Sequence, residues 1–542
     1  MKKLVLVLLA IVMSAFCSLF LSACSPSQNN NEHVHEYETK TVEANCLKGG
    51  YTEHSCSCGH SYKTDETTTT EHNFKNYECT ICGYKISTSE GLYYELSKDG
   101  TYYIVSGVGS CTSEKIVIPS VHNDLPVKEI GEKAFYFPGE TSRKITTVVI
   151  PDSVTTIGAQ AFFCREVANL TLPDSVTDIG ESAFEGCDLT QLTIPYGVIN
   201  IGDDAFRSNN LENVQISNSV KSIGERAFRQ NKFTDIAIPE SVVNIGAGAF
   251  SVCENLIEIN VDEKNQNYCS IDGNLYNKDT TEIVQYAIGK NEKSFTVPNG
   301  VATIKDSSFI ACNLEILICS DSVTNIELYS IYASKDLKSV ILGKNTRRIG
   351  DHAFANCVSL ETIEIPQSLS YIDENAFADC NNLKSINVSE KNSTFSSLDG
   401  NVYNKDFTTL ILYAKGKEDT TFTIPNSVTT IGNRAFLGCV NLTKVILPNS
   451  LLVVDEFAFF SCDNLTEIDI PDSVKHVKRD AFYGCENLSS VHMGKGILEI
   501  GAYAFDECPS LEKMTYNGTK EQWREVDKGY SWGDIQVECI NN

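Results

Sequence analysis

A 23-residue stretch that restarts along the chain constrains the fold more than any other feature of this sequence. From Ile424 to Ile446 it runs IPNSVTTIGNRAFLGCVNLTKVI, and the same pattern begins again at Leu447. Neither a strand period of 2 nor a helix period of 3.6 runs through the unit. Self-similarity at a fixed period of this length is typical of a solenoid, in which each unit buries its apolar side chains against its neighbours.

The register of the repeats follows from a marker aromatic residue, which comes after alanine in most units. Fourteen units have such markers, at Phe135, Phe162, Phe184, Phe206, Phe228, Phe250, Phe309, Tyr332, Phe354, Phe377, Phe436, Phe459, Phe482 and Phe505. Successive markers are 22 or 23 residues apart almost everywhere, 27 apart once and 59 apart twice. The two long steps hold related inserts, near residues 261–295 and 388–422, that share the pattern DGN-x-YNKD. Asp-Gly turns between alternating apolar residues predict a β-hairpin or small β-meander standing on the solenoid.

Within each unit the residue pattern predicts one short strand and one tight turn. The Leu-x-x-Ile-x-Ile segment, such as Leu465 to Ile470, alternates between two sides and predicts a strand. Neighbouring strands, stacked about 4.8 Å apart, are expected to form one long parallel sheet. The Gly-x-x-Ala-Phe segment, such as Gly432 to Phe436, predicts a short helical or 3-10 turn on the opposite side. The predicted solenoid covers residues 87–515, and a C-terminal cap at 516–542 contains both tryptophans, Trp523 and Trp532.

The repeat unit resembles the BspA-type leucine-rich repeat of bacterial surface proteins. The resemblance covers about residues 91–539, with the pattern IP-x-SV-x-x-IG-x-x-AF-x-GC-x-NL-x-x-I. It is carried by segments such as Ile470-Pro471-Asp472-Ser473-Val474, Ile431-Gly432, Ala481-Phe482, Gly484-Cys485 and Asn487-Leu488. The resemblance implies a leucine-rich-repeat solenoid and a role in adhesion, since members of the family bind host matrix proteins such as fibronectin and fibrinogen.

The N-terminus has the features of an export signal followed by a lipid anchor. Lys2 and Lys3 precede an apolar run, so residues 1–23 are predicted to be a signal peptide. The Leu-Ser-Ala-Cys sequence that ends at Cys24 resembles the bacterial lipobox, whose cysteine is diacylated, and residues 24–32 follow as a polar tether. A plain signal peptide and a membrane helix are the alternatives. We expect an exported chain, anchored to the cell membrane by acyl chains and exposed at the surface.

Residues 33–86 form a separate segment that is rich in cysteine and histidine. Its two close cysteine pairs, Cys56 with Cys58 and Cys79 with Cys82, have the spacing of a small zinc ribbon. The further candidate ligands are Cys46, His35, His54, His60 and His72. Disulfides are the alternative, because exported cysteines meet an oxidising compartment. The odd number of cysteines favours a mixed cysteine–histidine site, but structural zinc and disulfides both stay open.

The cysteines of the repeat units point to a structural role. Nine of them lie three residues after a marker: Cys187, Cys253, Cys312, Cys357, Cys380, Cys439, Cys462, Cys485 and Cys508. Two other units have Asn209 or Asn231 at this place. A position shared by cysteine and asparagine is typical of the ladder position in leucine-rich repeats, where a small buried group bonds the neighbouring backbone. Oxidation of some of these cysteines to disulfides is the alternative.

The sequence contains no pattern typical of an enzyme or of a nucleic-acid-binding protein. The formal net charge is −27, which repels phosphate backbones. The histidines beyond residue 86 share no common place in the unit, and no P-loop, nucleophile elbow or dinucleotide fingerprint occurs. We therefore expect no catalytic residues, no nucleic-acid partner and no cofactor other than a structural zinc.

The outward side of the predicted sheet offers a candidate partner site. The outward residue between the last two aliphatic residues of each strand is usually polar, but Ile316, Ile318 and Ile341 fall on two adjacent strands. Exposed apolar patches of this kind mark partner sites. Alternatively, the first insert, at Cys269 to Lys290, folds over this patch and buries it. We expect a surface binding protein that holds a matrix-type extracellular protein or a glycan; the alternative is a self-associating structural component of a surface layer.

Overall fold

The computed structural model describes residues 36–44, 48–67, 74–75, 78–79, 81–82, 87–136, 144–530 and 535–541, and divides the chain into two units, 1–86 and 87–542. In the first unit β1 (Tyr37–Val42), β2 (Tyr51–Cys56) and β3 (Ser61–Thr64) form an antiparallel sheet, and β4 (Phe74–Lys75) pairs with β5 (Glu78–Cys79). The predicted signal peptide and lipidation site lie outside the described residues. Within the described ranges, no helix has the length and apolar character needed to cross a membrane.

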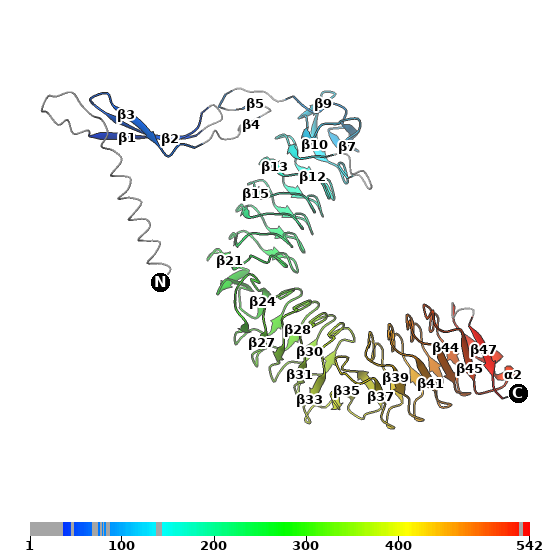
Figure 1. Cartoon of the computed structure of the whole chain (residues 1–542). Helices are drawn as coiled ribbons and strands as arrows, with labels where there is room; N and C mark the ends of the chain where they lie inside the picture. The colour runs from blue at the N-terminus through cyan, green and yellow to red at the C-terminus, as the bar shows by residue number, and fades with distance from the viewer. Residues whose placement is uncertain are drawn as a thin grey trace, which may run out of the picture. The chain divides into compact units, whose positions relative to one another are not determined.

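The second unit is a solenoid in which each coil contributes a strand to a parallel ladder, so the predicted fold class is confirmed (Figure 1). We call this row of three- or four-residue strands the long-strand ladder. Its members are β8 (Lys115–Val117), β11 (Thr147–Val149), β13 (Asn169–Thr171), β15 (Gln191–Ile194), β17 (Asn213–Ile216), β19 (Asp235–Ile238), β21 (Glu258–Val261), β25 (Ser294–Thr296), β27 (Ile316–Ile318), β29 (Ser339–Ile341), β31 (Thr362–Ile365), β33 (Ser385–Val388), β37 (Thr421–Thr423), β39 (Lys444–Ile446), β41 (Glu467–Ile470), β43 (Ser490–Met493), β45 (Lys513–Tyr516) and β47 (Gln536–Cys539).

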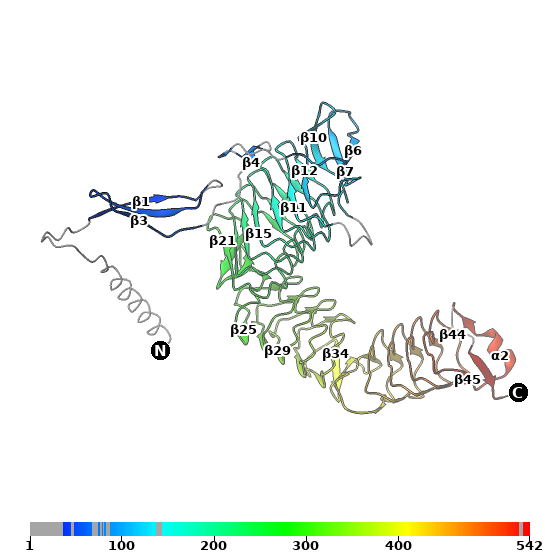
Figure 2. The same ribbon diagram turned by 45° about the horizontal axis from the view of Figure 1, so that its top comes forward.

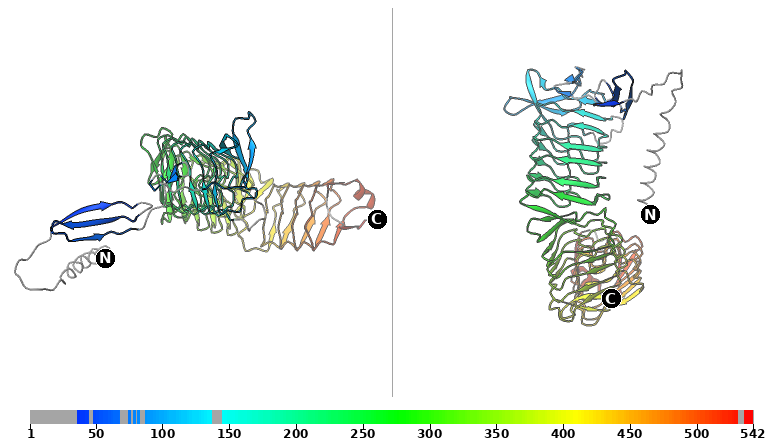
Figure 3. Two further views of the ribbon diagram at one scale, coloured as in Figure 1. Left: turned by 90° about the horizontal axis from the view of Figure 1, so that it is seen from above. Right: turned by 90° about the vertical axis from the view of Figure 1, so that its left-hand side faces the viewer.

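A second row of parallel strands, the short-strand ladder, was not expected from the sequence. Most of its strands contain only two residues, the isoleucine before the glycine and the residue that precedes it. Two residues are too few to show the alternation from which a strand is predicted. They are β10 (Leu125–Ile130), β12 (Thr156–Ile157), β14 (Asp178–Ile179), β16 (Asn200–Ile201), β18 (Ser222–Ile223), β20 (Asn244–Ile245), β24 (Glu282–Gln285), β26 (Thr303–Ile304), β28 (Asn325–Ile326), β30 (Arg348–Ile349), β32 (Tyr371–Ile372), β36 (Thr409–Leu412), β38 (Thr430–Ile431), β40 (Val453–Val454), β42 (His476–Val477), β44 (Glu499–Ile500) and β46 (Asp527–Lys528). Figure 3 shows the strands of successive coils side by side.

The Gly-x-x-Ala-Phe segment is a chain of tight turns, and the prediction of a helical or 3-10 turn there is wrong. Arg434 and Gly438 have φ values of 57° and 64°, in the left-handed region that a right-handed helix excludes. Hydrogen bonds to the next coil support this conformation: the N–H of Phe436 donates to the carbonyl of Ala458 (2.8 Å). These bonds between coils alternate with turn bonds inside the segment, such as that from the N–H of Ala435 to the carbonyl of Gly432 (3.2 Å).

Most marker aromatic residues stack in the core, as the repeat pattern predicts. Tyr332 does not: in its coil Ile331 is completely buried at the marker position, where its N–H donates to the carbonyl of Ala353 (2.9 Å). Phe459 is completely buried between Phe436 and Phe482, with ring centroids 4.7 and 4.9 Å apart and rings within 6° of parallel. The same stacking joins Phe162, Phe184 and Phe206, at 5.2 and 5.5 Å. Runs of stacked rings therefore link neighbouring coils along the axis of the solenoid.

The long-strand ladder is not the single continuous sheet that was expected. Its strands pair in the groups β8–β11–β13, β15–β17, β19–β21, β25 to β33 and β37 to β47. The last two gaps coincide with the inserts, which form the hairpins β22 (Tyr268–Ile271) with β23 (Asn274–Asn277), and β34 (Phe395–Leu398) with β35 (Asn401–Asn404). The carbonyl of Gly273, in the first hairpin turn, accepts a hydrogen bond from the N–H of Ile259 in β21 (2.9 Å). A turn thus lies beside β21 where the next strand would pair.

The second half of each insert is a further coil of the solenoid. β24 and β36 pair in parallel with β26 and β38 of the short-strand ladder. Tyr286 and Tyr413 take the marker position, and their rings lie 4.9 and 5.1 Å from those of Phe309 and Phe436. The two coils escaped notice in the sequence because their marker precedes the alanine instead of following it.

Both ends of the core are covered (Figure 2). At the N-terminal end β6 (Tyr93–Leu96) and β7 (Tyr103–Gly107) form the expected hairpin around Gly100, whose φ is 72°, and β9 (Val121–His122) pairs with β10. At the C-terminal end α2 (Lys520–Glu525) places Trp523 against the core, with its ring 5.0 Å from that of Tyr516. The other predicted cap residue, Trp532, lies outside the described residues.

Candidate functional site

The repeat cysteines are buried, and most of them bond the backbone of the preceding coil, which confirms the ladder interpretation. The thiol of Cys462 donates to the carbonyl of Phe436 (3.1 Å), and that of Cys485 to the carbonyl of Phe459 (3.2 Å). Asn231 makes the equivalent bond to Phe206 (3.0 Å). Burial raises the pKa of Cys439 to about 12, so this thiol stays protonated at neutral pH and is a poor nucleophile.

The three isoleucines predicted as a partner site lie on the outward side of the long-strand ladder. Ile316 in β27 is 39% exposed, and Ile341 in β29 is 51% exposed. Ile318 is half-buried and lies opposite Ile341 in the parallel register of the two strands. The first insert leaves Ile316 and Ile341 in contact with solvent, because its hairpin turn lies against β21 instead.

A fourth outward aliphatic residue, Ile446 in β39, escaped the sequence analysis. It is 43% exposed and holds the place in its strand that Ile341 holds in β29. The matching order Val340-Ile341-Leu342 and Val445-Ile446-Leu447 is the signal that could have revealed it. Ile446 borders a groove.

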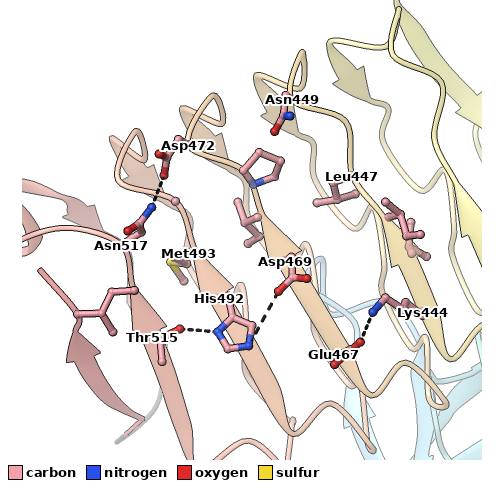
Figure 4. A pocket seen from close by; sticks show the side chains of 16 residues that line it. Lys444, Leu447, Asn449, Glu467, Asp469, Asp472, His492, Met493, Thr515 and Asn517 are labelled. Carbon is pink, nitrogen blue, oxygen red and sulfur yellow. Dashed lines mark hydrogen bonds and ion pairs between the residues drawn. The ribbon is translucent and has the colours of Figure 1, made fainter.

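This groove, of about 740 Å³, lies across β39, β41, β43 and β45 and is open to solvent (Figure 4). Its exposed apolar side chains are Ile446 and Ile540, which borders it from beyond β47, whereas Ile470 and Met493 lie beneath it in the core. Polar and charged side chains stand between them because outward positions of neighbouring strands lie next to one another. The charged side chains that line it are Lys444, Glu467, Asp469 and Asp472.

The polar side chains of the groove are largely paired with each other. Lys444 and Glu467 form an ion pair, and the hydrogen bond from Lys444 lowers the pKa of the Glu467 carboxyl. His492 Nδ1 lies 2.5 Å from the hydroxyl of Thr515. Asp472 accepts a hydrogen bond from the Asn517 amide (3.1 Å). These pairs join β39 to β41, β43 to β45, and the turns that follow β41 and β45.

Ser490, His492 and Asp469 are the residue types of a hydrolase triad, but their geometry is different. The hydroxyl of Ser490 lies 3.2 Å from Nε2 of His492, and the nearer Asp469 oxygen lies 3.9 Å from the same nitrogen. In a triad the carboxylate bonds the opposite ring nitrogen and so orients the imidazole as a base. The His492 side chain is also 52% exposed, so water competes for every group of the set. The groove has the features of a binding surface.

The candidate zinc ligands of the first unit are only partly described. Cys56 is buried and Cys58 exposed in the turn between β2 and β3, where the N–H of Cys56 donates to the carbonyl of His60 (2.9 Å). His54 stacks on Tyr62 with ring centroids 4.6 Å apart, and His60 Nδ1 lies 2.8 Å from the hydroxyl of Tyr37. Among the described side chains, no three histidine, cysteine or acidic residues converge as metal ligands. The other candidates, Cys46, His35, His72 and the side chain of Cys79, lie outside the described residues, as does Cys24.

One family model matches most of the chain. The BspA type leucine rich repeat region, with six copies, matches residues 109–212, 177–292, 281–404 and 413–525. No curated protein matches the sequence.

Several solved structures contain similar repeats. A leucine rich cell surface protein of Faecalibacterium prausnitzii A2-165 is 24% identical, with 81% of this chain and 97% of that chain covered and a TM-score of 0.38. A leucine-rich repeat protein of Bacteroides ovatus ATCC 8483 is 25% identical, with 84% and 100% covered and a TM-score of 0.35. The pneumococcal vaccine antigen PcpA is 19% identical, with 84% and 98% covered and a TM-score of 0.40.

Proposed function

Because this chain belongs to the BspA-type leucine-rich repeat family, we propose that it is a surface binding protein without enzyme activity. It holds a matrix-type protein or a glycan on the outward side of its long-strand ladder. The core and ladder residues recur from coil to coil and build the solenoid, so recognition depends on the outward residues, which differ between coils.

The observation that carries this proposal is the exposure of aliphatic side chains on that outward side. Ile316, Ile341 and Ile446 are between 39% and 51% exposed on strands whose outward positions are otherwise mostly polar. Burying the apolar surface of an exposed aliphatic side chain releases free energy, and a partner that covers the side chain would gain it. The groove beside Ile446 adds charged and hydrogen-bonding groups that give such a contact its specificity.

The proposal predicts that the full chain binds immobilised matrix proteins and that a patch variant loses affinity. Replacing Ile316 and Ile341 together with serine should weaken binding by roughly tenfold or more, since about 1.4 kcal/mol of lost burial corresponds to tenfold in Kd. Surface plasmon resonance measures the loss. The matched control replaces Leu452 and Leu498, which are 44% and 58% exposed outside the long-strand ladder, with serine.

Unchanged affinity of the Ile316 and Ile341 variant would remove this patch from the proposed site. Equal losses in both double variants would show a general effect of exposed aliphatic residues. A chain that self-associates in analytical ultracentrifugation and binds neither proteins nor glycans would instead be a structural component of a surface layer.

We further propose that Cys24 is lipidated and anchors the chain to the membrane. The support is the Leu-Ser-Ala-Cys sequence after the apolar run and the polar tether that follows it. Intact mass analysis of the purified mature chain would show the acyl chains, and a mass that matches unmodified cysteine would contradict the proposal.

For the first unit we propose a structural zinc ion, held by Cys56, Cys58, Cys79 and Cys82. The tight turn that carries Cys56 and Cys58, closed by the N–H of Gly59 on the carbonyl of Cys56 (2.8 Å), supports the first pair of ligands. We expect about one zinc ion per chain in elemental analysis of the purified protein, and its loss on changing Cys58 to serine. The control changes Cys164, an exposed cysteine of the solenoid, to serine. A zinc-free wild-type chain would favour disulfides.

A further inference from the structure

The outward positions of β13, β15 and β17, near the N-terminal end of the solenoid, are polar but carry no charge. Six side chains on β13, β15 and β17 form this surface, which we call the amide face: Asn169, Thr171, Gln191, Thr193, Asn213 and Gln215. All six are exposed, and all are amides or hydroxyls, in a chain with a formal net charge of −27. The absence of any ionic group from six exposed neighbouring positions sets this surface apart from the groove near the C-terminus.

The amide face has a regular geometry. In the parallel register of β15 and β17, Gln191 lies opposite Asn213 and Thr193 opposite Gln215. Strands in such a pair are about 4.8 Å apart, so the paired side chains form rows across the coils. The coil of β13 is joined to that of β15 by a hydrogen bond from the N–H of Asp188 to the carbonyl of Val167 (3.1 Å).

The hydrogen-bonding capacity of the amide face is unused within the described part of the chain. None of its six side chains has a hydrogen bond or ion pair there, whereas Lys444 with Glu467 and His492 with Thr515 pair with each other in the groove. Each side-chain amide offers two donor hydrogens and an acceptor oxygen, and each hydroxyl is both donor and acceptor. The amide face therefore offers both hydrogen-bond donors and acceptors to a ligand.

An aromatic ring stands at the margin of the amide face. Tyr196 lies two residues after the end of β15 and is 70% exposed, although its N–H donates to the Asp174 carboxylate (3.3 Å). The equivalent places of the neighbouring coils hold Asp174 and Asn218, so this ring is particular to the coil of β15. An exposed ring with a fixed backbone offers a flat apolar surface next to the rows of amides.

We infer that the amide face binds a neutral oligosaccharide chain, an inference that rests on the proposed binding function and names a ligand class for one part of the surface. Sugar hydroxyls are donors and acceptors at once, which matches the amides and hydroxyls of β13, β15 and β17, and the C–H side of a sugar ring packs on an aromatic ring such as Tyr196. A protein partner is less well matched, because the cores of protein interfaces are rich in apolar and aromatic groups. An acidic glycan or nucleic acid would require cations, and the amide face has none.

The test is affinity electrophoresis of the full chain through gels that contain one glycan each. Dextran, yeast mannan, laminarin and galactan are the neutral probes, and hyaluronan and polygalacturonate are the acidic ones. We expect at least one neutral glycan to retard the chain, with little change between low and high salt, because no ion pair contributes. The acidic glycans should not retard it.

Variants locate the site. Changing Gln191 and Asn213 together to alanine, or Tyr196 to alanine, should weaken retardation at least tenfold, whereas Tyr196→Phe should retain most of it because the ring remains. The matched control is Asn387→Ala, since the Asn387 amide on β33 is already bonded to Glu364 (2.8 Å). Unchanged thermal unfolding of each variant shows that the coils are intact.

The outcomes separate this inference from the proposed function. If the chain binds matrix proteins but no neutral glycan retards it, or if it binds a neutral glycan that the variants bind equally well, the amide face is not the site and the binding function stands. Retardation by acidic glycans alone would also overturn the inference. Failure to bind any protein or glycan would overturn both.

Discussion

Replacing Phe459 with alanine is expected to lower the free energy of unfolding by about 3–5 kcal/mol, the range for removing a buried phenylalanine. The ring is completely buried and stacks on Phe436 and Phe482, at 4.7 and 4.9 Å. Its removal leaves a cavity that two neighbouring coils line, and both coils are held by turns that cannot collapse without breaking hydrogen bonds between coils. Urea unfolding followed by circular dichroism measures the loss.

The effect should be concentrated near the substitution, because the stability of a solenoid is nearly a sum over neighbouring coils. Hydrogen exchange should accelerate in the coils of Phe436, Phe459 and Phe482 more than in those near Phe162. The control is Leu452→Ala, since Leu452 is 44% exposed in the same coil and its truncation should cost less than about 1 kcal/mol. A loss below about 1 kcal/mol for Phe459→Ala would show that the stack is not a main source of stability.

Replacing Asn231 with alanine is the second substitution expected to have a large effect, with a loss of about 2–4 kcal/mol. The Asn231 amide donates to the carbonyls of Phe206 (3.0 Å) and Phe228 (2.9 Å), and its oxygen accepts from the N–H of Leu211 (3.1 Å). The side chain is 4% exposed, so water cannot replace these bonds. Leaving a buried donor or acceptor without a partner costs about 1–3 kcal/mol.

Other coils of the repeat show which residue could recover part of the stability lost at this position. Asn231→Cys places there the residue that other coils use, as where Cys253 donates to the carbonyl of Phe228 (3.3 Å). We expect Asn231→Cys to recover part of the loss, because a thiol restores one bond to the preceding coil but does not reach the N–H of Leu211 as the amide does. Equal stability of Asn231→Cys and Asn231→Ala in urea unfolding would contradict a bonding role for the ladder position.

The ladder and the aromatic stack could be predicted because each of their positions recurs at the spacing of one coil. A residue 23 positions before another lies next to it in the solenoid, so Phe436 had to face Phe459 and Cys439 had to precede Cys462 in one column. The same spacing could be used on the outward side, where it places Asp469 beside His492. Ile446 was overlooked there although the rule places it one coil before Asp469.

The turns and the inserts could not be predicted in the same way. The backbone at Arg434 is left-handed because the N–H groups of its turn pair with the next coil, and an isolated segment carries no sign of that pairing. Tyr286 and Tyr413 became part of the aromatic stack although their local order differs from that of the other units, because the core accepts any ring that reaches the column.

The sequence by itself determined the period, the buried residues and the ladder, and hence a solenoid, since these follow from which residues recur. Only the tertiary structure decided that the hairpins interrupt the long-strand ladder, that Ile316 and Ile341 stay exposed, and that outward side chains are paired in the groove but unpaired on the amide face. The physical reason is that spacing along the chain states which coils are neighbours, whereas hydrogen bonds and exposure depend on distances between individual side-chain atoms.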